Sequence, residues 1–132
     1  ELFNNAIRRL DTVSRYGGEE FLFIFPDMDL EQAGIVVDRI RKQLTDASIS
    51  HQGNLHRVTA SFGVTQLCRF CDIKGSIKRA DIAMYAAKEK GRNNTVTIDS
   101  RAIVGQTSYD HLNNDITELM RQHCHLVKQN SD

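Results

Sequence analysis

The chain has 132 residues, of which 40% are apolar, so its length fits one domain of ordinary size with its own hydrophobic core. Its 17 basic and 17 acidic residues give a formal net charge of zero, which argues against a nucleic-acid binder that works by bulk positive charge. The longest apolar runs fall far short of the roughly 18 residues that cross a bilayer, so we predict neither a nucleic-acid partner nor membrane contact for this segment.

The first residues predict an opening helix followed by a β-hairpin. Five apolar residues of ELFNNAIRRL recur at helical spacing: Leu2, Phe3, Ala6, Ile7 and Leu10. No capping residue precedes them, so we expect the chain to begin inside a helix, as the later part of a larger domain. In DTVSRYGGEEFLFIFPD, two extended runs flank Gly17-Gly18, and a Gly-Gly loop predicts a hairpin because its turn needs positive φ. Both faces of the second run are apolar, which predicts a central strand covered on both sides.

The remaining segments predict alternating helices and strands. Asp29 is expected to cap a helix with Gln32 in the capping-box position, and HRVTASFGVTQ alternates as a strand does. SIKRADIAMYAAKEKG predicts a helix capped by Ser76 and stopped by Gly91, and NTVTID predicts a short strand. A last helix is predicted from Ser108 to about Lys128. The order of elements predicts an α+β domain with a single sheet flanked by helices.

Two adjacent carboxylates, Glu19 and Glu20, open the most apolar run of the chain directly after the glycines. A buried unpaired charge costs several kcal/mol, so either the pair is solvated at an exposed turn or a cation meets it. In the second case a carboxylate beside the glycine turn would hold Mg²⁺, and the missing side chains would let a phosphate or a nucleobase approach the backbone. The residue types alone leave both interpretations open.

Three stretches of the chain resemble one family in order and spacing. RYGGEEF is similar to the signature of GGDEF-domain diguanylate cyclases in its GGEEF form, VTASFGVT resembles a strand of that family, and RADIAMYAAKEKGRN resembles its final helix and the turn beyond. The resemblance runs from about Leu2 to Ile98. It implies a palm-like, ferredoxin-like nucleotidyl-cyclase fold over residues 1–99. Residues 100–132 lie beyond the resemblance, and the helical spacing there predicts a helical tail. The resemblance also implies that two GTP molecules are joined into cyclic di-GMP with release of pyrophosphate.

The resemblance assigns an active site by position in these motifs. Glu19 matches the family's metal-binding and catalytic carboxylate, and Glu20 matches a second carboxylate of the site. Gly17 and Gly18 match the turn that lies against the nucleotide. Two basic residues match those that contact the GTP phosphates, although alone they would be ordinary cations at a helix C-terminus: Lys88 and Arg92. The implied cofactor is Mg²⁺, with Mn²⁺ as an alternative, and the family's scheme requires a homodimer because each domain holds one GTP.

The stretch RRLD supplies a second motif before the signature. Taken alone, Arg8 and Asp11 would be a weak pair on a helix surface. In this register they match the family's inhibitory product site, which Arg39 would complete, and guanidinium groups suit phosphates and guanine edges. An alternative function follows, that of a non-catalytic cyclic di-GMP receptor that binds through Arg8 and Asp11.

Part of the family's site lies upstream of the matched region. The resemblance implies that the family's first strand supplies an aspartate and a carbonyl to the metals, and we can assign neither to a residue here. We therefore expect the N-terminal strand of the fold to be missing and these 132 residues to be incomplete for catalysis on their own. The input signal, and any anchoring of the parent protein in the inner membrane through upstream segments, stay open.

The cysteines offer a competing interpretation. Cys68 and Cys71 have a spacing typical of zinc sites, and HCH adds His123, Cys124 and His125. Neighbouring residues of one helix point to different faces, so the zinc interpretation is the weaker one. Three cysteines without a framework spacing instead predict reduced thiols and a cytoplasmic location.

Overall fold

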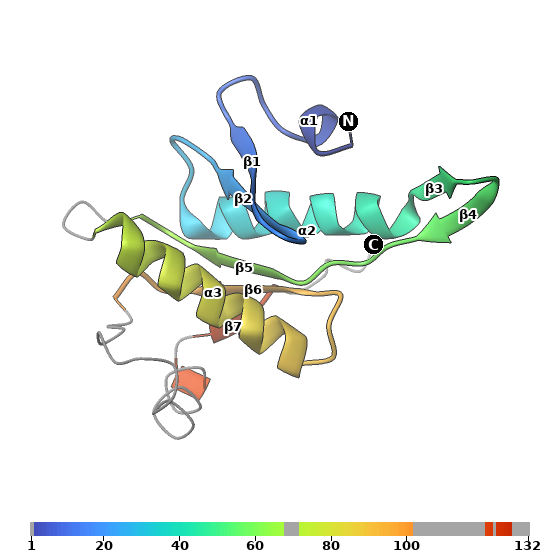
Figure 1. The fold of residues 1–132 in the computed structure, drawn as a ribbon. Coiled ribbons are helices and arrows are strands. Elements are labelled where there is room, and N and C mark those ends of the chain that lie inside the picture. The colour runs from blue at the N-terminus through green and yellow to red at the C-terminus, as the bar shows by residue number, and fades with distance from the viewer. Residues whose placement is uncertain (1, 68–71, 102–120, 123, 128–132) are drawn as a thin grey trace.

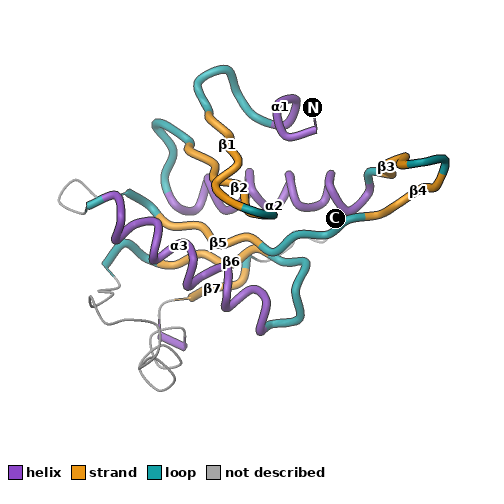
Figure 2. The backbone as a smooth tube through the Cα atoms, viewed as in Figure 1, coloured by secondary structure: helices purple, strands orange, loops and turns teal. Residues whose placement is uncertain are grey.

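The computed structural model describes residues 2–67, 72–101, 121–122 and 124–127. The helices are α1 (Leu2–Ala6), α2 (Leu30–Asp46) and α3 (Ile73–Glu89), and the strands are β1 (Thr12–Gly17), β2 (Glu20–Ile24), β3 (Ser48–His51), β4 (Asn54–Arg57), β5 (Phe62–Thr65), β6 (Thr95–Ile98) and β7 (Cys124–Leu126) (Figures 1 and 2). None of the helices in these ranges is long and apolar enough to cross a membrane.

The α+β class is confirmed, and the core lies on the two faces of the sheet β5-β6-β7. Strand β5 pairs in parallel with β6, and β7 pairs antiparallel to β6. Helix α3 packs on one face of this sheet, where Ile82, Ala83, Val96 and Ile98 belong to one buried cluster. Helix α2 packs on the other face with Ala33, Val37 and Val64 (Figure 1).

The single sheet that we predicted is instead three separate sheets in the described residues. Strands β1 and β2 pair only with each other, and so do β3 and β4. The first hairpin meets the main sheet through side chains, because the Phe23 and Phe62 rings pack edge to face with centroids 6.3 Å apart. Among the described residues, no strand forms backbone hydrogen bonds that would join the first hairpin to the main sheet.

The first hairpin differs from its prediction in two ways. Its turn is Gly18-Glu19 rather than Gly17-Gly18, because Gly17 still pairs with Glu20 and only Gly18 has a positive φ, of 53°. Strand β2 was also predicted to be covered on both sides, which is wrong for this structure. The Phe3 ring packs against Phe21 and Phe23, whereas Ile24 stays 54% exposed because no described element covers its face.

The two long helices follow their sequence signals, apart from one cap. Helix α2 has the predicted capping box, in which the Asp29 carboxylate accepts from Gln32 N at 2.8 Å. Helix α3 ends just before Gly91, whose φ of 107° suits a helix stop. Its cap, however, is Asp72 and not Ser76, which lies buried inside the helix.

Two strand predictions also need correction. The alternating stretch that begins at residue 56 is divided between the end of β4 and β5, and the β3–β4 hairpin was not predicted. The helix predicted from Ser108 to about Lys128 is wrong for Cys124–Leu126, which form β7 beside β6. Most of that helix lies outside the described residues, so the division into 1–99 and 100–132 stays a prediction.

Candidate functional site

The tip of the first hairpin presents both predicted carboxylates to solvent. Gly18 and Glu19 form the turn, Glu20 begins β2, and all three residues are exposed. Arg15 stabilises the turn, since its Nε and Nη2 donate to the Gly18 carbonyl oxygen at 2.9 and 2.7 Å. The turn is therefore exposed, as the solvated interpretation requires, and the same exposure leaves Glu19 and Glu20 accessible to a cation.

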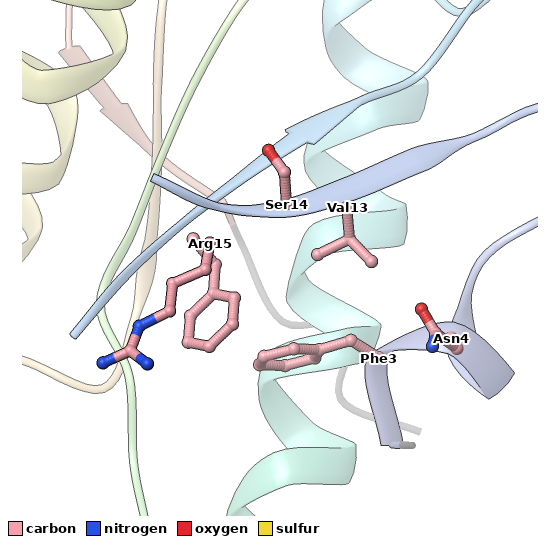
Figure 3. A pocket seen from close by; sticks show the side chains of 6 residues that line it. Phe3, Asn4, Val13, Ser14 and Arg15 are labelled. Atoms are coloured by element: carbon pink, nitrogen blue, oxygen red, sulfur yellow. The ribbon is translucent and has the colours of Figure 1, made fainter. Parts of the chain in front are cut away.

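An open depression of about 200 Å³ lies between α1 and this hairpin (Figure 3). Phe3 and Asn4 line it from α1, and Val13, Ser14, Arg15 and Phe21 line it from the hairpin. In Figure 3 the Phe3 ring and the Arg15 guanidinium lie along the same side of β1. None of the residues predicted for the site lines this depression, and the sequence pattern of the opening helix gave no sign of it.

The predicted phosphate-binding residues lie at the end of α3. Lys88 is in the last turn of the helix and Arg92 in the loop that follows, and both side chains are exposed. The Arg92 backbone is left-handed, with φ of 62°, and its N–H donates to Ala87 O at 3.1 Å. In the described part of the chain neither cation forms an ion pair with a carboxylate, so both can meet an anion.

The carboxylates and the cations lie on two separate elements. No hydrogen bond or ion pair within the described ranges joins Glu19 or Glu20 to Lys88 or Arg92. A ligand that used both groups would have to extend from the hairpin tip to the end of α3.

The hairpin tip fits a divalent cation in part. Carboxylate oxygens are the ligands that Mg²⁺ prefers, and Glu19 and Glu20 supply them at an accessible turn. Among the described residues, no group of three or more His, Cys, Asp or Glu side chains is placed to hold a metal ion. These two carboxylates would therefore provide only part of a coordination shell.

The structure brings Arg8 and Asp11 together in a turn, not on a helix. Arg8 Nη2 and Nε donate to Asp11 Oδ1 at 2.8 and 3.1 Å, Arg8 N donates to Oδ2 at 2.7 Å, and Nη2 also reaches Pro26 O at 2.7 Å. The Asp11 side chain is only 1% exposed, whereas that of Arg8 is half-exposed. Arg39 extends from α2 and donates to Ala6 O at 3.3 Å, and no described hydrogen bond connects it to Arg8 or Asp11.

Arg8 stabilises the charged form of Asp11. Its side-chain hydrogen bond holds the pKa of the Asp11 carboxyl below the ordinary 3.8, and this effect outweighs burial, which acts in the opposite direction. Such a group stabilises the fold fully above its unfolded-state pKa, and it loses that contribution as the pH falls through its folded-state pKa.

Asp11→Asn should therefore lower the free energy of unfolding at neutral pH and have a smaller effect in acid. Denaturant unfolding of the wild type and the variant at a series of pH values would measure the difference, which should shrink as the pH falls below about 4. Asp46→Asn is the control, because Asp46 is exposed at the end of α2. A difference independent of pH would contradict the role given to the Arg8 charge.

The zinc interpretation falls mostly outside the described residues, which exclude Cys68, Cys71 and His123. Cys124 is buried in the apolar cluster beneath α3, and burial raises the pKa of its thiol to about 11. His125 follows it on β7 and is exposed, so the two side chains point to opposite faces of the strand. The thiol of Cys124 therefore packs as a small apolar group.

Comparisons with known proteins agree with the motifs. The family described as "Diguanylate cyclase, GGDEF domain" matches residues 1–94. Diguanylate cyclase A of Treponema denticola is 36% identical over 94 residues, which is 70% of this chain and 25% of that protein. Response regulator PleD of Caulobacter vibrioides is 38% identical over 93 residues, 68% of this chain and 20% of that protein. The chain thus spans a quarter or less of these curated relatives.

Solved structures show the same relationship. The diguanylate cyclase SiaD of Pseudomonas aeruginosa, solved with its activator SiaC, matches with a TM-score of 0.69 and 33% identity over 73% of this chain and 37% of that one. The GGDEF domain of DgcB from Caulobacter crescentus, solved with c-di-GMP, matches with a TM-score of 0.67 and 25% identity over 73% of this chain and 58% of that one. The chain belongs to the GGDEF-domain family of diguanylate cyclases.

Proposed function

We propose that this chain is the GTP-binding part of a diguanylate cyclase, which condenses two GTP molecules into cyclic di-GMP and releases pyrophosphate. The observation that carries the proposal is the intact GGEEF turn, which presents Glu19 and Glu20 to solvent at the tip of a hairpin. Lys88 and Arg92 add two exposed cations without carboxylate partners in the described residues. The family model matches residues 1–94, which contain all four residues.

The proposed reaction joins a ribose 3′-hydroxyl of one GTP to the α-phosphorus of the other. The new P–O bond forms as the bond between the α- and β-phosphates breaks, pyrophosphate leaves, and the hydroxyl proton passes to solvent. The reciprocal step on the other GTP closes the ring and releases the second pyrophosphate. Glu19 and Glu20 would hold the divalent cation and orient the phosphates around it. Lys88 and Arg92 would neutralise the charge that collects on the departing pyrophosphate. Each domain would bind one GTP, so two copies must face each other.

We propose Mg²⁺ as the cofactor, with Mn²⁺ as an alternative. When bound, the cation would polarise phosphate oxygens and lower the pKa of the attacking hydroxyl. Glu19 is its principal ligand in this proposal, because the turn holds that residue at the hairpin tip. Further ligands would have to come from outside the described carboxylates, since these residues form no group of three or more.

The activity assay separates this proposal from its alternative. The full-length protein is incubated with GTP and Mg²⁺, and cyclic di-GMP and pyrophosphate are quantified. An enzyme releases two pyrophosphates for each cyclic di-GMP that it forms, one for each phosphodiester bond. A protein that binds cyclic di-GMP tightly and produces none would instead be the non-catalytic receptor, which the ordered Arg8–Asp11 pair would favour.

We also propose that cyclic di-GMP inhibits the enzyme at Arg8, with Arg39 as a second cation. Arg8 is half-exposed and can offer its free edge to a phosphate or to guanine. In this site Asp11 would act through Arg8, because its carboxylate already accepts three donors of Arg8 and so orients that guanidinium. The site adjoins β1, which leads directly to the catalytic turn.

Arg8→Ala should weaken the binding of cyclic di-GMP about tenfold to a hundredfold, the value of one charge-assisted hydrogen bond. Titration calorimetry on the full-length protein would measure the affinity, and a rate assay at rising product concentration would measure the inhibition. Arg9→Ala is the matched control, since it removes the same charge from the neighbouring exposed position. Equal affinities of Arg8→Ala and Arg9→Ala for cyclic di-GMP would mean that Arg8 and Asp11 form only a structural ion pair.

A further inference from the structure

A buried polar cluster joins α2 to the loop that carries Arg92. We call it the α2–loop network, and it consists of Asp38, Arg41 and Thr45 on α2, Asn93 in the loop after α3, and Thr95 at the start of β6. Its ion pair is almost fully enclosed, since Asp38 is 5% exposed and Arg41 is 4% exposed. Only Asn93 lies within the family motifs described above, as the last residue of RADIAMYAAKEKGRN, and the resemblance assigns it no role.

The hydrogen bonds of the network converge on Asn93. Arg41 Nε donates to Asp38 Oδ1 at 2.7 Å, while its Nη1 donates to Asn93 Oδ1 at 3.0 Å and to Asn93 O at 3.2 Å. The Thr45 hydroxyl donates to the same Asn93 Oδ1 at 3.1 Å. Two side chains of α2 therefore hold one amide oxygen that is about fifty positions away in sequence.

Stability alone is a weak reason for such an arrangement. A buried ion pair often contributes no more than apolar residues of similar volume would. Burial raises the pKa of Asp38, but the hydrogen bond and charge of Arg41, the hydrogen bond of Thr95 and the charge of Lys42 together outweigh burial. They leave that pKa below its ordinary value, so the pair stays charged. The ion pair with Asp38 does fix the orientation of the Arg41 guanidinium, and the hydrogen bonds of that guanidinium hold Asn93 in place.

The loop is held equally firmly from α3. Asn94 Nδ2 donates to Ala87 O at 3.1 Å and to Arg92 O at 3.2 Å, and Arg92 N donates to Ala87 O at 3.1 Å. Arg92 and Asn93 are both left-handed, with φ of 62° and 47°, which is uncommon for residues other than glycine. The Arg92 backbone is thus fixed between two helices, although its side chain is exposed.

We propose that Asn93, held by Arg41 and Thr45, is a positioning residue that aims Arg92 at the phosphates of GTP. This inference rests on the phosphate-binding role of Arg92 in the proposed function. A fixed backbone lowers the entropic cost of binding through a long side chain, because only the rotamers of that side chain then have to be ordered. The left-handed loop and the enclosed ion pair are both explained if the direction of Arg92 matters.

Asn93→Gly tests this inference with the backbone preserved. Glycine accepts the positive φ at this position and lacks the Oδ1 that Arg41 and Thr45 hold. In the full-length protein we expect the affinity for an unreactive GTP analogue with Mg²⁺ to fall roughly tenfold, as for the loss of one or two hydrogen bonds. The KM for GTP should rise in parallel.

Two further variants separate positioning from a general loss of stability. Thr65→Val removes a partly buried hydrogen bond to Ile98 O elsewhere in the sheet, so it should lower the melting temperature and leave the analogue affinity unchanged. In an Arg92→Ala background, Asn93→Gly should cause no additional loss of affinity, because its effect acts through Arg92.

The outcomes distinguish this inference from the proposed function. If Arg92→Ala weakens the binding of the analogue but Asn93→Gly does not, the positioning role is wrong and the phosphate-binding role stands. Additive losses in the double variant would likewise overturn positioning, since Asn93 would then act independently of Arg92. If the wild type does not bind the analogue, or if Arg92→Ala has no effect, the proposed phosphate site is wrong and the inference is lost with it.

Discussion

Glu19→Ala in the full-length protein should abolish the synthesis of cyclic di-GMP from GTP and Mg²⁺. Glu19 occupies the tip of the β1–β2 hairpin, where its carboxylate is exposed and the turn before it is fixed by Arg15 on Gly18 O. In the proposed mechanism this carboxylate holds the cation on which charge neutralisation at the phosphates depends. Loss of such an electrostatic group lowers reaction rates by about a hundredfold to a thousandfold. Loss of the cation itself should lower the rate further.

The measurement is the initial rate of cyclic di-GMP formation at saturating GTP and Mg²⁺. The hairpin should survive the substitution, because Glu19 makes no hydrogen bond or ion pair in the described residues, and circular dichroism would confirm this. Glu31→Ala is the matched control, since it removes an exposed glutamate from the first turn of α2. A rate for Glu19→Ala within tenfold of the wild-type rate would contradict the catalytic role proposed for Glu19.

Local sequence signals predicted the parts of the fold that local interactions decide. The capping box of Asp29 and Gln32 lies within one helical turn, and the structure forms it as expected. The cap predicted for α3 was Ser76, but the helix starts one turn earlier, with Asp72 as its cap. Tertiary packing places Ser76 inside the helix, where it is buried and its hydroxyl accepts from Arg79 Nη2 at 2.9 Å.

Predictions that depend on distant partners were less successful. The stretch before Leu126 has helical periodicity, but Cys124–Leu126 pair with β6, a strand that lies nearly thirty residues earlier. The candidate site shows the same limit. The resemblance predicts site roles for Glu19 and Arg92, whereas the contact of Arg41 with Asn93 joins residues 52 apart, and no local pattern predicts that contact.

The Gly63→Ala substitution should disrupt the core between β5 and α3. A Cβ atom at this position would overlap the backbone oxygen of Ala80 and the backbone nitrogen of Met84, and it would lie 2.9 Å from the carbonyl carbon of Ala83. These atoms belong to the helix backbone, so no side-chain rotation can relieve the overlap. Helix α3 would have to move away from the sheet, and the apolar contacts beneath it would be lost.

We expect Gly63→Ala to lower the free energy of unfolding by about 3 kcal/mol or more, as overpacking against a rigid backbone does. Urea unfolding followed by circular dichroism would measure the change. Gly34→Ala is the matched control, because its Cβ would meet only the methyl groups of Thr97 and Val127, at 3.1 and 3.2 Å. Those side chains can shift, and alanine favours a helix interior by about 1 kcal/mol over glycine, so the control should stay close to the wild type. A Gly63→Ala protein as stable as Gly34→Ala would mean that α3 does not pack this closely on β5.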